Sequence, residues 1–444
     1  MGVITLKQAA NWCGGTVRPE FENVTFLGAG NDTRKLLPGQ IFVALEGVRD
    51  GHEFIGAAME KGAAAVLCKH CTEDVPAILV EDPRAALGKI AAGERQRIGM
   101  QVVGVTGSVG KSTTKEMIAC VLEGSYRVSK TPANFNNDLG MPMAILSMPD
   151  TTQVAVLEMG MNHFREIAYL SNIAKPDVGV IINVGTMHIE HLGSREGILQ
   201  AKLEILEGMA ADAPLLLNAD NDLLGSCDPG RKVTYFGTQP DCDVQAMDIR
   251  EENGSISYTA CWQGGQFPVT LPLEGMHYVS DSLAAVSVGL QLGVKPEQIA
   301  CRLSVFQTME GRQEIFESNG FTIIKDCYNA GPESMAAALA VLGRRNGRRI
   351  AVLGDMLELG DCAPAEHRKV GAIAAQNADM ILAYGPCGDY VAEGAKGNCR
   401  VFHDRSVMAQ ALRSLAQPGD ILLFKGSHGM HIELVLEAFL KLDT

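Results

Sequence analysis

The stretch from Val102 to Met117 reads Val-Val-Gly-Val-Thr-Gly-Ser-Val-Gly-Lys-Ser-Thr-Thr-Lys-Glu-Met, and it decides the fold of the chain. An apolar strand runs into a glycine-rich turn, and a helix then opens. Glycines let backbone N–H groups approach an anion, and a helix N-terminus adds unpaired donors and the positive end of its dipole. The order predicts a phosphate-binding loop made of seven consecutive residues, Gly107, Ser108, Val109, Gly110, Lys111, Ser112 and Thr113.

The loop is a variant of the P-loop pattern. The strict pattern has glycine five positions before Gly110, whereas this chain has Val105 there and glycines at Gly104 and Gly107. A capped helix start after a strand is the alternative interpretation, but the strand-turn-helix context favours a nucleoside triphosphate. We expect Lys111 to reach the β- and γ-phosphates and the Ser112 hydroxyl to bind Mg²⁺.

The composition describes an ordinary globular protein of 444 residues, for which about three domains are expected. The net charge of -14 argues against nucleic acid or an anionic membrane as a partner. The twelve cysteines show no framework spacing, which suits a reducing cytoplasm. We interpret the single C-x-x-C, Cys68 to Cys71, as a surface turn with free thiols rather than a zinc site. No apolar run is long enough to insert into a membrane, so a cytoplasmic protein is expected.

The order of apolar segments predicts an α/β protein of three domains. A small α/β unit spans 1–82, and a central domain at 83–312 has a parallel sheet with an antiparallel extension at 243–273. A helix at 279–292 and a linker at 306–312 follow, and 313–444 reads as a doubly wound, Rossmann-like domain. In such sheets, ligands bind beyond the carboxyl ends of the strands.

Two polar residues follow buried strands of the central domain, at the place where ligands bind. Glu158 ends the strand 154–158 and could reach a metal ion or its waters. His188 follows the strand 178–184, and by itself it fits a hydrogen-bonded polar residue near a strand end better than a metal ligand.

Lys202 lies in the middle of the apolar face of a helix predicted over 195–209. Ile198, Ile205, Leu206 and Met209 surround it, and glutamates and a glutamine lie opposite. Burial of an unpaired ammonium is costly, so such a lysine snorkels, finds an acidic partner or loses its proton. A neutral amine can add CO₂ and become a carbamate, which is an oxygen ligand for Mg²⁺. From the pattern alone, snorkelling or ion pairing is the more common outcome.

These segments, in this order, resemble the Mur ligases over essentially the whole chain. The resemblance rests on the following stretches: Gly104-Val-Thr-Gly-Ser-Val-Gly-Lys-Ser-Thr, Thr131-Pro-Ala-Asn-Phe-Asn-Asn-Asp-Leu-Gly-Met-Pro, Glu158-Met-Gly, Asn183-Val-Gly, Ala201-Lys-Leu-Glu, Gly311-Arg, Asp326-Cys-Tyr-Asn-Ala and Gly354-Asp-Met-Leu-Glu-Leu-Gly. The last two stretches resemble the branch that adds D-alanyl-D-alanine, because the Asp-Asn-Pro-Arg loop of the diaminopimelate-adding relatives is absent.

The resemblance implies roles for individual residues. It places Thr33 and Arg34 at the UDP-sugar, and it implies two Mg²⁺ sites held by Ser112, Glu158, His188 and a carbamylated Lys202. Residues implied to lie near ATP are Asn134, His277, Asp281, Arg312 and Asp326. Residues implied to lie near the peptide substrates are Asn136, Asn137, Asn329 and Asp355. Tyr278 and Asp281 stand where relatives usually have asparagine.

The function implied is ATP-dependent amide formation through an acyl phosphate. D-Ala-D-Ala would be joined to UDP-N-acetylmuramoyl-tripeptide for peptidoglycan synthesis, by a monomer whose domains close before chemistry. A folylpolyglutamate-type or other Mur-type ligase and a non-catalytic P-loop switch are the alternatives. The third residue of the tripeptide, lysine or diaminopimelate, stays open.

Overall fold

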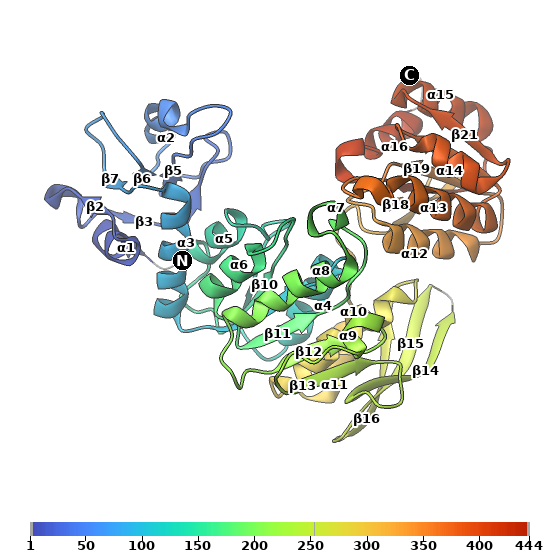
Figure 1. Cartoon of the computed structure of the whole chain (residues 1–444), viewed down its shortest axis with the longest axis horizontal. Coiled ribbons are helices and arrows are strands. Elements are labelled where there is room, and N and C mark those ends of the chain that lie inside the picture. The colour runs from blue at the N-terminus through green and yellow to red at the C-terminus, as the bar shows by residue number, and fades with distance from the viewer. Residues whose placement is uncertain (1–2, 253, 442–444) are drawn as a thin grey trace.

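The structure is a computed structural model that describes residues 3–252 and 254–441. Its three large sheets have five, nine and six strands, and each forms the centre of one lobe. In Figure 1 the first lobe is blue, the central lobe runs from cyan to yellow, and the third lobe is orange to red. The mixed α/β architecture expected from the sequence is confirmed.

The first lobe contains the five-stranded sheet β2-β7-β6-β5-β4. Its strands are β2 (Thr16–Val17), β4 (Ala29–Gly30), β5 (Ile41–Val43), β6 (Ala65–Cys68) and β7 (Ala77–Leu79), and a small pair is formed by β1 (Ile4–Thr5) and β3 (Thr25–Phe26). The expectation that Cys68 and Cys71 share a surface turn is wrong for Cys68. Cys68 ends β6 and is fully buried, because both faces of that strand are covered. All twelve cysteines are free thiols.

The central lobe contains the nine-stranded sheet β16-β15-β14-β13-β12-β11-β8-β10-β9. Its parallel part consists of β8 (Gln101–Thr106), β9 (Val128–Lys130), β10 (Val154–Glu158), β11 (Val178–Ile181), β12 (Leu215–Asn218) and β13 (Val233–Gly237). The antiparallel extension consists of β14 (Val244–Glu252), β15 (Ser255–Trp262) and β16 (Gly265–Leu271), as expected. Strand β8 lies between β10 and β11, so the segments that follow these three strands meet at one edge.

The third lobe contains the six-stranded sheet β17-β18-β22-β19-β20-β21. These strands are β17 (Glu314–Ser318), β18 (Phe321–Asp326), β19 (Arg349–Gly354), β20 (Met380–Tyr384), β21 (Cys399–Phe402) and β22 (Ile421–Lys425). Only the edge pair β17–β18 is antiparallel, and the other pairs are parallel as the βα alternation indicated. The carboxyl end of β18 lies beside that of β22, which brings Asp326 next to Lys425.

Helices cover the sheets of all three lobes. They are α1 (Leu6–Cys13), α2 (Ile55–Glu60), α3 (Pro83–Ile98), α4 (Lys111–Leu122), α5 (Gly140–Leu146), α6 (Glu166–Ala174), α7 (Ile189–Leu192), α8 (Arg195–Leu203), α9 (Asp222–Gly225), α10 (His277–Gln291), α11 (Pro296–Leu303), α12 (Pro332–Gly343), α13 (Ala363–Asn377), α14 (Gly388–Ala395), α15 (Arg405–Leu415) and α16 (Glu433–Leu440). Short 3₁₀ turns occupy Pro19–Phe21, Gly51–Phe54, Glu204–Glu207, Gly360–Cys362 and His428–Met430. Within the described ranges, none of these helices has the length and apolar character needed to cross a bilayer.

The long helix α3 shows how local sequence sets an element's limits. Asp82 accepts hydrogen bonds from the N–H groups of Arg84 and Ala85, and Pro83 occupies the first helical position. Gly99, with φ of 69°, ends the helix in the left-handed conformation that glycine adopts readily. This helix joins the first lobe to the central one.

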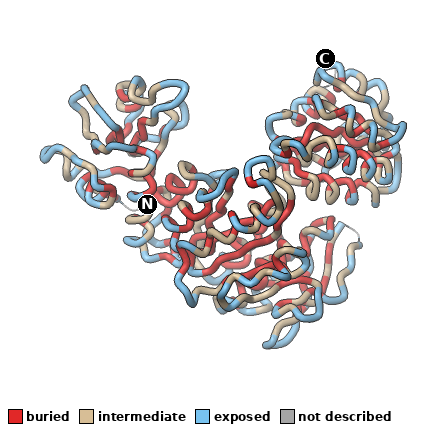
Figure 2. The backbone as a smooth tube through the Cα atoms, viewed as in Figure 1, coloured by how far each residue is buried: buried red, intermediate tan, exposed pale blue. Residues whose placement is uncertain are grey.

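The helix predicted over 195–209 is shorter than expected. Helix α8 ends at Leu203, and Glu204–Glu207 tighten into a 3₁₀ turn. The apolar face is nevertheless buried as expected, since Ile198, Lys202 and Ile205 have almost no exposed surface. Figure 2 shows that burial is concentrated in the strands and in the inward faces of the helices of each lobe.

Candidate active site

A cavity of about 480 Å³ lies between the central and third lobes. Both lobes line it, since the phosphate-loop residues contribute on one side and residues that follow β18 contribute on the other. It brings together fifteen of the residues singled out in the sequence: Ser108, Val109, Gly110, Lys111, Ser112, Thr113, Asn134, Asn136, Glu158, His188, His277, Asp281, Arg312, Asp326 and Asn329.

The phosphate loop is held in shape by Asn183, which follows β11. The Asn183 side-chain oxygen accepts hydrogen bonds from the N–H groups of Ser108 (2.9 Å) and Val109 (3.0 Å), and its amide nitrogen donates to the Val109 carbonyl (2.9 Å). Gly110 has φ of 79° and immediately precedes α4. The turn therefore requires glycine at this point, as a phosphate loop should.

Lys111 lies within the loop rather than extending from it. Its Nζ donates to the carbonyls of Gly107 (2.9 Å) and Ser108 (3.2 Å). Burial lowers the pKa of Lys111 from its ordinary value, whereas the nearby Glu158 opposes that shift. An anion in the cavity would give this ammonium a stronger partner than two carbonyls.

Ser112 and Arg312 connect the loop to the linker between the lobes. The Ser112 hydroxyl accepts a hydrogen bond from Arg312 (2.8 Å), and the guanidinium of Arg312 lies 4.0 Å from the ring centre of Tyr328. The stacked ring fixes the plane of the guanidinium. A cation from the linker thus points at the place where the terminal phosphates would lie.

Glu158 is the best candidate for a metal ligand. Its side chain is only 2% exposed, and Asn136 donates to Oε1 at 2.8 Å. Oε2 has no hydrogen-bond partner among the described residues, and Lys115 Nζ is 3.9 Å away. A buried carboxylate oxygen without a hydrogen bond is costly, and coordination to a hard cation such as Mg²⁺ would satisfy it.

His188 faces the third lobe. Its Nδ1 lies 2.5 Å from Glu358 Oε2, although the angle departs from that of a regular hydrogen bond. This contact is the main cause that lowers the pKa of the Glu358 carboxyl. The sequence indicated His188 as a candidate, whereas Glu358 lies in the quoted stretch Gly354-Asp-Met-Leu-Glu-Leu-Gly but had been given no role of its own.

Lys202 is buried, with 1% of its surface exposed, although it does not line the cavity itself. Among the described residues, its ammonium has no hydrogen-bond or ion-pair partner. Burial places its pKa well below the ordinary lysine value, and the charge of Lys111 adds to that effect. The ion-pairing interpretation is therefore not supported, and the lowered pKa favours a neutral amine.

His277 and Asp281, both on α10, line the cavity, where Asp281 is buried against the phosphate loop and His277 is half-buried. Burial lowers the pKa of His277 to about 4 and raises that of Asp281 to about 7. The Asp281 Oδ1 accepts a hydrogen bond from the Thr114 hydroxyl at 3.0 Å. It also lies so close to Gly110 that a Cβ on this glycine would approach it to 2.7 Å.

The third lobe contributes an ion pair that the sequence did not indicate. Lys425 Nζ donates to Asp326 Oδ2 (2.6 Å) and to the Asn329 carbonyl (3.0 Å). Asp326 had been singled out, but Lys425 lies 99 residues further along the chain, at the end of an apolar strand, so the pairing depends on the register of β18 with β22. Glu333 was also missed, and it accepts hydrogen bonds from the Thr186 N–H (2.9 Å) and hydroxyl (3.1 Å).

Several singled-out residues do not line the cavity. Thr33 and Arg34 lie in the first lobe, where the Arg34 side chain is 85% exposed and pairs with Asp32 at 2.8 Å. The Asn137 side chain accepts from the Gly140 N–H (2.8 Å) at the start of α5. The buried Asp355 accepts from the Cys387 N–H at 3.0 Å. Gly107 contributes only the carbonyl that Lys111 binds.

Family models match two parts of the chain. The Mur ligase middle domain matches residues 105–289, and the Mur ligase glutamate ligase domain matches residues 311–428. The first match contains the phosphate loop, Glu158, His188 and Lys202. The second contains Arg312, Asp326 and Lys425. The two matches therefore meet at the cavity.

Relatives match the chain over nearly its full length. UDP-N-acetylmuramoyl-tripeptide–D-alanyl-D-alanine ligase from Bacillus subtilis is 40% identical, with 98% of this chain and 97% of the relative covered. A crystal structure of MurF from Acinetobacter baumannii has a TM-score of 0.93 at 32% identity and 99% coverage of both chains. MurF from Thermotoga maritima in complex with ADP has a TM-score of 0.83 at 31% identity, with 93% of this chain and 97% of that one covered. The chain belongs to the Mur ligases, in the family of the UDP-N-acetylmuramoyl-tripeptide–D-alanyl-D-alanine ligases.

Proposed function

We propose that this chain is an ATP-dependent ligase that joins D-Ala-D-Ala to UDP-N-acetylmuramoyl-tripeptide, giving the pentapeptide used in peptidoglycan synthesis. The observation that carries the proposal is the cavity, where the phosphate loop of the central lobe faces Asp326 and Lys425 of the third lobe. A non-catalytic P-loop switch would have no need for a second lobe that brings its own charged groups to the phosphates.

The reaction requires that a poor leaving group becomes a good one. The carboxylate of the tripeptide attacks the γ-phosphorus of ATP, the bond to the bridging oxygen breaks, and ADP leaves with that electron pair. The amine of the dipeptide then attacks the acyl carbon, loses a proton and expels phosphate. Lys111 and Arg312 lie where they would neutralise the charge that gathers on the phosphates.

Four residues fit the two Mg²⁺ ions that such a ligase uses. Glu158 offers an unpaired buried oxygen, Ser112 a hydroxyl, His188 a ring nitrogen, and Lys202 a carbamate once it has added CO₂. When bound, Mg²⁺ supplies positive charge that would align the tripeptide carboxylate with the phosphates of ATP. Asn136 holds the Glu158 carboxylate in orientation.

The remaining assignments follow from this activity. We assign residues 1–82 to UDP-sugar binding through Thr33 and Arg34, 83–312 to ATP binding, and 313–444 to ATP and dipeptide binding. Asn134, His277, Asp281 and Asp326 are placed at the nucleotide, and Asn136, Asn137, Asn329 and Asp355 at the peptide substrates. The enzyme works in the cytoplasm as a monomer.

The test of the activity is ADP formation with varied substrates. With UDP-N-acetylmuramoyl-tripeptide present, D-Ala-D-Ala should support ADP formation and single amino acids should not. The tripeptide is offered with lysine or with diaminopimelate at its third position, and a pteroylglutamate acceptor serves as the matched control. ADP formation without either peptide substrate, or with the pteroylglutamate, would contradict the proposal.

The carbamate at Lys202 is tested separately. Lys202→Ala should lower kcat about 10³-fold, because one oxygen ligand and its negative charge are lost. Lys202→Glu, which supplies a carboxylate in a similar place, should retain more activity than Lys202→Arg, which keeps a cation. In the native enzyme, ¹³C-labelled bicarbonate should give a carbamate resonance that Lys202→Ala lacks. Equal activity of the Glu and Arg variants without a resonance would exclude the carbamate.

A further inference from the structure

The contact between His188 and Glu358 crosses from the central lobe to the third lobe. His188 directly precedes α7, and Glu358 lies in the loop Gly354-Asp-Met-Leu-Glu-Leu-Gly, which follows β19. Nδ1 of His188 is buried and lies 2.5 Å from Oε2 of Glu358, at an angle outside that of a regular hydrogen bond. Neither the phosphate loop nor the Asp326–Lys425 pair takes part in this contact.

The backbone at both ends of the contact is strained. His188 has φ of 66° and Glu358 has φ of 63°, and both are left-handed conformations that residues with a Cβ rarely adopt. Such conformations persist when the surroundings demand them, and they occur often at functional sites. Here they bring the two side chains together from different lobes.

The chemistry of the histidine gives the contact a role. A histidine that binds a metal ion usually donates its other ring N–H to a carboxylate, which fixes the tautomer and the ring orientation. With Nδ1 turned toward the Glu358 carboxylate, the favoured tautomer carries its proton on Nδ1, which leaves Nε2 with a free lone pair. His188 lines the cavity, so Nε2 is the nitrogen available to a cation beside the phosphate loop.

We propose that Glu358 is a positioning residue for the metal site, which orients His188 across the boundary between the lobes. This inference rests on the proposed function, because it takes His188 as a ligand of Mg²⁺. Its consequence is that the affinity for the second cation depends on the third lobe being docked. The loop that sets the dipeptide-adding branch apart would then also complete the metal site.

The experiment measures binding of Mn²⁺ by electron paramagnetic resonance in the full-length protein saturated with ADP. Glu358→Ala should weaken the second Mn²⁺ site about 10- to 100-fold. Glu358→Gln should weaken the second site less, because its amide oxygen still accepts from Nδ1–H. Glu358→Asp should likewise keep part of the Mn²⁺ affinity. Thermal melts confirm that each variant folds.

Two controls separate this inference from the proposed function. Glu190→Gln changes a glutamate that lies against Gly360 at the same boundary and has no hydrogen bond or ion pair with His188 among the described residues, and it should leave Mn²⁺ binding unchanged. His188→Gln should weaken the second site as strongly as Glu358→Ala or more. If His188→Gln has no effect, the proposed metal site is wrong. If His188→Gln weakens binding but Glu358→Ala does not, the positioning role is wrong.

A spectroscopic readout distinguishes positioning from direct ligation. In ¹⁵N-histidine spectra of the metal-free protein, His188 should carry its proton on Nδ1 in the wild type and populate both tautomers in Glu358→Ala. If Glu358 were itself a metal ligand, Glu358→Ala would keep the single tautomer of the wild type, and the Ala and Gln variants would lose Mn²⁺ affinity equally. That pattern would overturn the proposal.

Discussion

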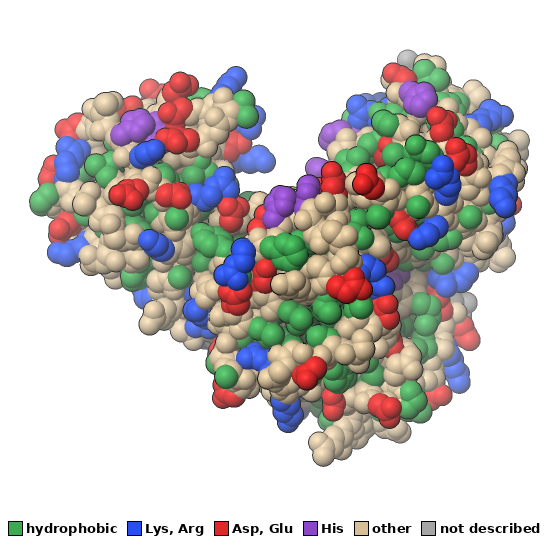
Figure 3. All heavy atoms as spheres, in the orientation of Figure 1, with side chains coloured by type: hydrophobic (Ala, Val, Ile, Leu, Met, Phe, Trp, Pro, Cys, Tyr) green, Lys and Arg blue, Asp and Glu red, His purple; other side chains and the backbone are tan. Residues whose placement is uncertain are grey.

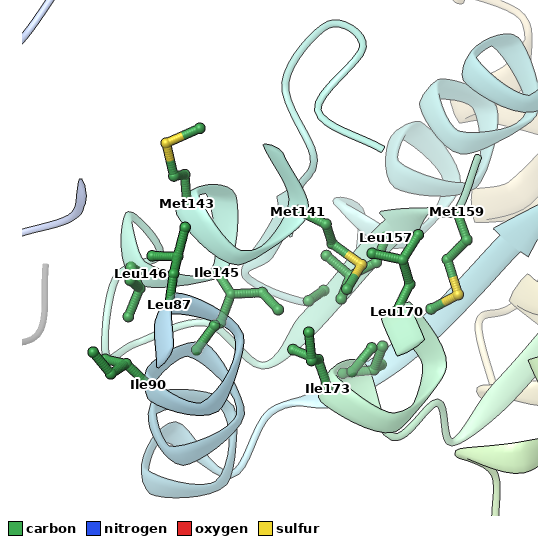
Figure 4. Packing of buried hydrophobic residues seen from close by; sticks show 14 of the residues in the cluster. Leu87, Ile90, Met141, Met143, Ile145, Leu146, Leu157, Met159, Leu170 and Ile173 are labelled. Atoms are coloured by element: carbon green, nitrogen blue, oxygen red, sulfur yellow. The ribbon is translucent and has the colours of Figure 1, made fainter. Parts of the chain in front are cut away.

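The first and third lobes are joined to the central lobe in different ways. A single buried apolar cluster runs from the first lobe into the central one, and α3 lies at its middle. Figure 4 shows Leu87 and Ile90 of α3 beside Met143, Ile145 and Leu146 of α5. Such a junction cannot open without exposing apolar surface to water.

The third lobe meets the central lobe through polar groups. Glu333 binds Thr186, and Arg345 lies 2.6 Å from Glu274. No buried apolar cluster in the described part of the chain contains residues from both of these lobes. Figure 3 shows a wide hollow between the first and third lobes above the central one.

The difference separates a fixed junction from a movable one. Polar contacts exchange for water at little net cost, whereas an apolar core does not. The first lobe should therefore keep its position while the third lobe opens and closes over the cavity. We expect this closure to precede the chemistry, since the third lobe brings its groups to a site built on the central one.

The largest effect is expected from a substitution in the apolar junction between the first and central lobes. Leu87→Ala should lower the free energy of unfolding by about 2–5 kcal/mol, because it removes a fully buried side chain and leaves a cavity. The first and central lobes should unfold together at the lower temperature in differential scanning calorimetry. The transition of the third lobe should not move.

The matched variant is Leu342→Ala, which truncates an equally buried leucine within the core of the third lobe. It should destabilise the third lobe alone. A single transition that shifts equally in both variants would show that the three lobes unfold as one unit, and the comparison would then fail.

A smaller effect on stability, which depends on pH, is expected from Asp281 in the cavity between the central and third lobes. Asp281 has a pKa of about 7 in the folded chain, so the native state binds a proton that the unfolded chain releases near pH 4. The native state therefore loses stability as pH rises through this range. Asp281→Asn replaces the carboxyl by an amide that does not ionise, so the variant does not lose this stability at high pH. The free energy of unfolding of the variant should exceed that of the wild type by about 1–3 kcal/mol at pH 8.

At pH 4 both proteins carry a neutral side chain at this position, and denaturant titrations should give them similar stability. A constant difference between the variant and the wild type from pH 4 to pH 8 would mean that the Asp281 carboxyl stays ionised. The cavity would then be wetter than the burial of Asp281 indicates.

The smallest effect is expected at the polar junction itself. Glu333→Ala removes two hydrogen bonds to Thr186 and should shift the open-to-closed ratio of the third lobe by about 1 kcal/mol, or about fivefold. Small-angle scattering should show a larger radius of gyration, while the melting temperature changes little. An unchanged radius together with a lower melting temperature would place Glu333 in a rigid interface.

Much of this architecture could be predicted from the sequence. Glycine spacing predicted the phosphate loop, and buried apolar runs predicted the parallel strands of the central and third lobes. Helical periodicity placed Lys202 in the middle of an apolar face, although the pattern alone favoured snorkelling or ion pairing over the burial that the structure shows. These features depend on neighbours within a few residues, which a single sequence contains.

The contacts between distant segments could not be predicted. Lys425 ends an apolar strand, and only the pairing of β22 with β18 brings it to Asp326. Glu358 reaches His188 because the two lobes dock, and no local pattern encodes docking. The end of α8 at Leu203 was also missed, because tertiary packing rather than propensity tightens the turn that follows.

The side chain of Asn183 has a consequence for how nucleotides associate. Because it ties down both Ser108 and Val109, the loop has already lost its conformational entropy when the chain folds. A nucleotide then meets a preorganised cradle and has no disordered segment to arrange, so more of its contact energy appears as affinity. These hydrogen bonds occupy the N–H groups of Ser108 and Val109. The N–H groups at the start of α4 are therefore left to bind the anion.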